Sequence, residues 1–118
     1  MKNFGYKTII VIQTLIIVVI AIAAWSPKAY APSLVASATL DFANTTAGTA
    51  TDLTISVSGA VDGDPVMVGI PNGSTVGNGH FVAWVSAPNV ATVRFLNNNL
   101  VTALNPASGV FKIIVLKK

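Results

Sequence analysis

The sequence predicts an all-β fold, a small β-sandwich or jelly-roll-like domain, preceded by one N-terminal transmembrane helix. Beyond residue 33, apolar side chains recur at every second position in several short runs, which is the period of a half-buried strand. Gly, Asn, Asp and Pro separate these runs at regular intervals, as in sandwiches and barrels. The helix is predicted by an almost unbroken apolar stretch from Thr8 to Trp25.

The first segment has the layout of either a signal peptide or a membrane anchor. A basic start leads into the apolar stretch, and Ala29-Tyr30-Ala31 has the form of a cleavage triplet. As a helix, the stretch would span about 27 Å, close to the roughly 30 Å of the hydrocarbon core. Pro32 follows the triplet directly and hinders a protease that binds its substrate extended. We therefore expect residues 1–31 to be a retained anchor with its linker, and residues 32–118 to form the β domain.

The ends of the apolar stretch indicate its orientation. Lys2 and Lys7 lie on one side and Lys28 alone on the other, so the positive-inside rule places the N-terminus inside. Aromatic rings sit at both ends, where headgroups favour them. The expected anchor residues are Tyr6, Ile9, Ile10, Ile12, Leu15, Ile16, Val19, Ile20 and Trp25. Gln13 is either a hydrogen-bonding residue that helps an oligomer form or a lone amide tolerated near the N-side end.

Six runs are predicted to be strands of the β domain. The last is more continuously apolar than the others, as in a strand that is covered on both faces. The linker before them, residues 26–33, contains two prolines. The runs comprise residues 34–42, 53–57, 66–70, 81–85, 91–95 and 110–116. The turn signals between them comprise residues 44–48, 59–65, 71–79, 87–89, 97–99 and 105–109.

The net charge of +3 belongs to the first 31 residues. From Pro32 onward, four basic residues balance four acidic ones, so the β domain lacks the excess of positive charge that nucleic-acid binding needs. The chain has no cysteine, which excludes disulfides and thiolate metal sites. A domain this small buries a modest fraction of its surface, and we expect it to gain stability as a homo-oligomer.

Candidate site residues are few. His80 is the only histidine and is expected at a strand start, as a surface imidazole rather than a catalytic or metal-binding group. Asp62 and Asp64 flank Gly63 in a predicted β-turn, with calcium binding as the alternative. Trp84 is predicted to be a core or subunit-interface residue rather than a sugar platform. Arg94 is expected to pair with an Asp across strands or across subunits.

The sequence carries no phosphate-binding Gly-rich loop, no paired catalytic carboxylates and no nucleophile elbow. It therefore predicts a protein that is not an enzyme and that uses no cofactor, metal or small-molecule substrate. Gln13, Trp84 and Arg94 are the candidate interface residues.

Residues 39–116 resemble a small β domain of bacteriophage virion proteins, the head-fibre or minor capsid type. The segments that carry the resemblance are residues 52–60, 62–64, 68–72, 83–87, 92–95 and 105–112. The resemblance implies a β-sandwich that assembles on virus particles and has no catalytic residue. Family domains are not usually attached to an apolar helix, and this difference suggests a virion that contains a lipid layer.

The leading expectation is a non-enzymatic virion protein, at a penton or spike base, whose helix enters the internal viral membrane. Its expected partners are lipid, copies of itself and other capsid proteins. The alternative is a secreted or surface-anchored bacterial adhesion module whose signal peptide is cleaved. A pilin-like filament subunit is disfavoured, because the type IV pilin helix needs an early acidic residue and none precedes Asp41.

Overall fold

The computed structural model describes residues 33–117 of the chain. Each of its six strands overlaps one of the predicted runs, so the all-β prediction is confirmed. In order, the elements are β1 (Leu34–Leu40), β2 (Ala50–Ser56), β3 (Val66–Gly69), the 3-10 helix η1 (Asn72–Ser74), β4 (Gly79–Ala87), β5 (Val90–Asn97) and β6 (Gly109–Val115).

The apolar stretch from Thr8 to Trp25, with its anchor residues and Gln13, lies outside the described residues. Within residues 33–117, no helix has the length and apolar character needed to cross a membrane.

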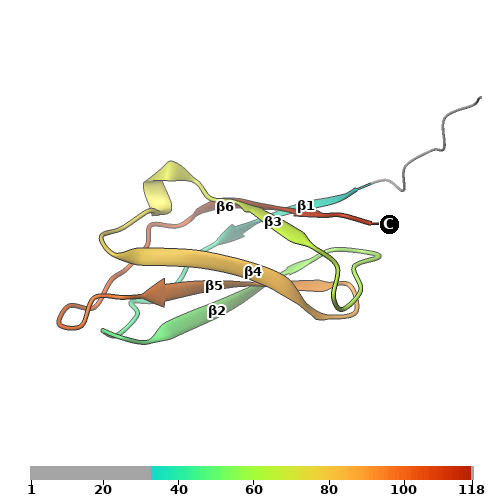
Figure 1. The fold of residues 1–118 in the computed structure, drawn as a ribbon. Helices are drawn as coiled ribbons and strands as arrows, with labels where there is room; N and C mark the ends of the chain where they lie inside the picture. The colour runs from blue at the N-terminus through green and yellow to red at the C-terminus, as the bar shows by residue number, and fades with distance from the viewer. Residues whose placement is uncertain (1–32, 118) are drawn as a thin grey trace, which may run out of the picture. The chain divides into compact units, whose positions relative to one another are not determined.

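The strands form two three-stranded antiparallel sheets, with the orders β1-β6-β3 and β2-β5-β4. Figure 1 shows them as two layers, which is the arrangement of a β-sandwich. Four of the five connections cross from one sheet to the other, and only β4 and β5 are joined as a hairpin. Most neighbours in a sheet are therefore distant in sequence.

The two ends of the sandwich are distinct. Leu34 pairs with Val115, so β1 begins where β6 ends, and we name this the linker end. The connection between β5 and β6 lies at the opposite end, which we name the distal end (Figure 1). Ser33, the first described residue, directly precedes β1 at the linker end.

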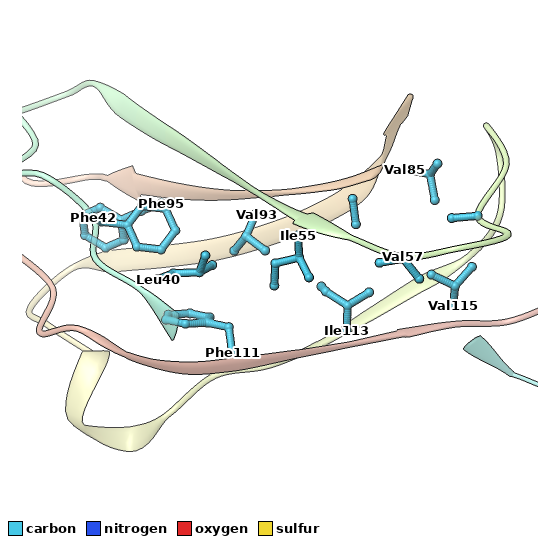
Figure 2. Close-up of a cluster of buried hydrophobic side chains, with 12 residues drawn as sticks. Leu40, Phe42, Ile55, Val57, Val85, Val93, Phe95, Phe111, Ile113 and Val115 are labelled. Carbon is cyan, nitrogen blue, oxygen red and sulfur yellow. The ribbon is translucent and has the colours of Figure 1, made fainter. Parts of the chain in front are cut away.

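The core fills the space between the sheets with every second side chain of the strands. At the distal end it is aromatic: Phe42 packs edge-on against Phe81 and Phe111, with ring centroids 5.5 and 5.7 Å apart. Phe95 is fully buried beside Phe81, at 5.0 Å. Towards the linker end, smaller side chains such as Val57 and Val115 replace the rings (Figure 2).

One sequence expectation about β6 is wrong within the described chain. The strand is central in its sheet, but only its inward side chains, such as Phe111 and Ile113, are buried. On the other face Val110 is 61% exposed. The largely apolar run therefore reflects one buried face and one outer face on which Val110 and Ile114 flank Lys112.

Candidate interaction surfaces

The outer face of the β2-β5-β4 sheet carries Trp84 and Arg94 and is named here the Trp84 face. Two rows of side chains run across the three strands of this face, and only the second row contains charged residues. The first row runs Thr54–Thr92–Trp84, and the second runs Asp52–Arg94–Val82. Trp84 and Arg94 are therefore diagonal neighbours on adjacent strands, within reach of each other.

Arg94 forms an ion pair within its own row and a stacking contact with Trp84 of the other row. Its Nε and Nη2 donate to the two carboxylate oxygens of Asp52 at 2.7 and 2.8 Å, in the bidentate geometry that suits a guanidinium. The same guanidinium lies 4.9 Å from the ring centroid of Trp84. The hydrogen bonds from Arg94 lower the pKa of Asp52 and raise the pKa of Arg94 itself.

This geometry decides two of the predictions. The expected pairing of Arg94 with an Asp across strands is confirmed, with Asp52 as the partner. The placement of Trp84 in the core is wrong, because the side chain points outward and is 37% exposed. The expectation that it lies in a subunit interface stays a prediction. One face of the indole is covered by Arg94, which leaves that face unable to stack on a sugar ring.

The side chains of the Trp84 face are pre-organised, which means that they are held in place before a partner binds. The ion pair and the stacking contact hold two long side chains in one conformation, so less rotamer entropy remains to be lost when a partner binds. Trp and Arg are enriched among the residues that dominate protein–protein binding energy. Val82, 42% exposed, adds an apolar contact beside them. The arrangement suits contact with a protein surface.

A second ion pair closes the linker end. Asp64 accepts hydrogen bonds from the Lys117 ammonium at 2.7 Å and from the Val61 backbone N–H at 3.0 Å. Lys117 also donates to the Gly59 carbonyl. These hydrogen bonds, that from Lys117 first, lower the pKa of Asp64. The contact holds the connection between β2 and β3 against the end of β6.

The predicted turn at Asp62 and Gly63 is confirmed. The Asp64 N–H donates to the Val61 carbonyl at 3.1 Å, and Gly63 has a φ of +87°, as a type II turn requires at its third residue. Asp64 is directed to Lys117 rather than to its neighbour Asp62. Within residues 33–117, no group of three or more His, Asp or Glu side chains is placed to hold a metal ion.

Both lowered Asp pKa values predict that acid lowers the stability of the domain. A carboxyl group with a folded-state pKa below its ordinary 3.8 stabilises the fold fully above that value. The contribution is lost as the pH falls through the folded-state pKa. We expect the urea midpoint to fall from pH 6 to pH 3, and to fall less steeply in Asp64→Asn. Asp62→Asn keeps the contact between Asp64 and Lys117, so its urea midpoint should fall with pH as steeply as that of the unchanged chain. If the urea midpoints of the two variants fell equally steeply, the ion pair of Asp64 would not be the cause.

His80 lies at the start of β4 and is exposed, as predicted for a surface imidazole. Its Nδ1 lies 2.6 Å from the side-chain nitrogen of Asn98.

Sequence reasoning missed an apolar loop at the distal end. Leu100 and Val101 are 87% and 89% exposed, at the tip of the connection between β5 and β6. The loop is nevertheless ordered, since Asn99 Oδ1 accepts hydrogen bonds from the N–H groups of Val101 and Thr102. Two apolar residues directly after three asparagines were the available signal.

Comparison of the chain with protein-family models, with curated proteins and with solved structures finds no match in any of the three. The resemblance to a virion β domain therefore rests on the sequence segments alone.

Proposed function

We propose that this chain is a non-enzymatic structural protein of a virion, which links the protein shell to an internal membrane. In this proposal the N-terminal apolar stretch is the membrane anchor, and the β-sandwich is the module that meets the shell. The observation that carries the proposal is the Trp84 face, a pre-organised surface of aromatic, apolar and internally paired charged groups on a β-sandwich. Such a surface suits lasting contact with protein.

The partners in this proposal are copies of the same chain, as a trimer or pentamer, and other capsid proteins at a vertex. The charge balance of the β domain supports protein contact over nucleic-acid contact, because Asp52 neutralises the only arginine. The cores of protein interfaces are poor in uncompensated charge and rich in aromatic residues and Arg. The Asp52–Arg94–Trp84 group has this composition.

The first test is the protein content of the particles. Mass spectrometry of purified virus particles should detect this chain, with peptides from residues 1–31 as well as from the β domain. Absence of the chain from the particles would refute the proposal. Peptides only from Pro32 onward would refute the retained anchor and favour the alternative, a secreted or surface-anchored adhesion module. That alternative also requires a measurable affinity for a glycan or receptor.

A variant series tests the Trp84 face itself. We expect Trp84→Ala to reduce incorporation into particles on the order of tenfold, the loss typical of an interface residue that dominates binding. Trp84→Phe keeps an aromatic ring for Arg94 and should retain most of the incorporation. Quantitative mass spectrometry measures the incorporation, and thermal unfolding checks that each variant is folded. Normal incorporation of a folded Trp84→Ala chain would show that this face is not the shell contact.

A further inference from the structure

The outer face of the β1-β6-β3 sheet has a composition unlike that of a water-facing sheet. An antiparallel sheet with one solvated face usually alternates apolar inward residues with polar outward ones. Here Val35, Met67 and Val110 are outward and are 63%, 56% and 61% exposed. Val35, Ile114 and Met67 form one row across all three strands. We name this surface the Met67 face.

The Met67 face carries one charged group. Its middle row runs Ser37–Lys112–Gly69, so the Lys112 side chain lies at the centre of the face. The outward positions of β1, β3 and β6 include no acidic residue. A lysine can lay its alkyl stem along apolar surface while its ammonium reaches outward. Amphipathic helices that lie in the membrane interface likewise combine apolar residues with lysine.

The position of Lys112 disfavours a second copy as the occupant of this face. A two-fold contact centred on the face would bring Lys112 against Lys112 of the other copy. Two like charges in a desolvated contact oppose association. Anionic lipid headgroups would instead pair with this ammonium.

The linker keeps the β domain close to any membrane that holds the apolar stretch. β1 is an edge strand of this sheet, and the eight residues 26–33 separate it from Trp25. Fully extended, eight residues reach about 28 Å. Such a tether gives an effective concentration in the mM range, so even a weak contact between the domain and the lipid surface is populated.

We propose that the Met67 face lies on the headgroup region of the bilayer that holds residues 8–25. This inference rests on the proposed function for the anchor. It orients the sandwich with the β1-β6-β3 sheet towards lipid and the Trp84 face, on the opposite sheet, towards the shell. Val35, Met67 and Ile114 contact the interface, and Lys112 pairs with anionic headgroups.

The absence of cysteine from the chain allows a sharp test. Single-cysteine variants of the full chain, Met67→Cys, Val82→Cys and Leu15→Cys, are labelled with an environment-sensitive fluorophore. Each is reconstituted into vesicles of phosphatidylcholine and phosphatidylserine. Val82 is the matched control, an outward apolar residue on the opposite sheet. Leu15 reports on the anchor.

We expect iodide to quench the label at position 67 several-fold more slowly than the label at position 82, and lipid-attached quenchers to reach position 67 but not position 82. The label at position 15 should be the deepest. If position 67 is as accessible to iodide as position 82 while position 15 is in lipid, the inference fails and the anchor stands. If position 15 is also in water, the anchor itself fails, and this inference with it.

Spin labels at position 67, in place of the fluorophore, distinguish coverage of the Met67 face by lipid from coverage by a second copy of the chain. Dipolar broadening between labels at position 67 of two chains would show that another copy covers the Met67 face, and would overturn the proposal. Unbroadened spectra together with lipid accessibility would support it.

Discussion

Phe95→Ala should lower the free energy of unfolding by about 3–5 kcal/mol, the usual loss when a buried Phe is truncated in a core that cannot collapse. Phe95 is fully buried and packs against Phe81 and Phe42, with ring centroids 5.0 and 6.2 Å apart. It also lies against the backbone of Gly79, where an added methyl group would overlap its ring. Gly79 has no side chain that could move into the vacated space.

Denaturant unfolding of the full chain in mild detergent, followed by tryptophan fluorescence, measures this loss. Val82→Ala is the matched control. It removes apolar atoms from an outward position of the neighbouring strand, and we expect a change within about 0.5 kcal/mol. Phe95→Leu keeps much of the buried volume, so its loss in the free energy of unfolding should lie between those of Phe95→Ala and Val82→Ala. A loss below about 1 kcal/mol for Phe95→Ala would contradict the aromatic core at the distal end.

Asn97→Asp should destabilise the domain by about 3 kcal/mol at neutral pH, since it buries an unpaired charge. The Asn97 side chain is almost fully buried, and its amide nitrogen donates to the Thr45 and Thr102 carbonyls at 2.8 and 3.0 Å. Its amide oxygen accepts from the Asn99 N–H. An aspartate at this position would place a second acceptor against two carbonyl oxygens.

The loss of stability caused by Asn97→Asp should become smaller in acid, whereas the unchanged chain itself becomes less stable in acid. The carboxyl group would have a folded-state pKa above its unfolded value, because burial and the two carbonyls disfavour the charged form. The destabilisation should therefore shrink as the pH falls and the carboxyl becomes protonated. Asn105→Asp, the same change at an exposed position, is the control and should be nearly neutral in stability. A similar loss in both variants would show that Asn97 does not hold the distal loops together.

Local pattern was sufficient to find the strands but not to pair them. The alternation in residues 53–57 and 91–95 predicts two strands, since the side chains of a strand alternate between its faces. That these two strands are neighbours, with Asp52 opposite Arg94, depends on a register between residues 42 positions apart. Sequence reasoning expected an Asp for Arg94 and could not choose among the four in the chain.

Trp84 and Asn97 show that local sequence pattern also does not determine whether a single side chain is buried or exposed. Trp84 lies among apolar neighbours in the sequence, which favours the core, but its place in the alternation of β4 turns it outward. Asn97 is one of three consecutive asparagines that read as a turn, yet it alone is buried, because the Thr45 and Thr102 carbonyls converge on it. Composition does not distinguish it from Asn98.

The all-β class and the approximate positions of the six strands follow from the sequence alone, because strand alternation and turn chemistry act over a few residues. The sequence also located the excess charge and the apolar stretch in the first 31 residues. The strand order, the Asp52–Arg94–Trp84 group and the two unlike outer faces emerge from the three-dimensional fold. These depend on contacts between strands distant in sequence, where sheet order and register determine which side chains meet and which remain exposed.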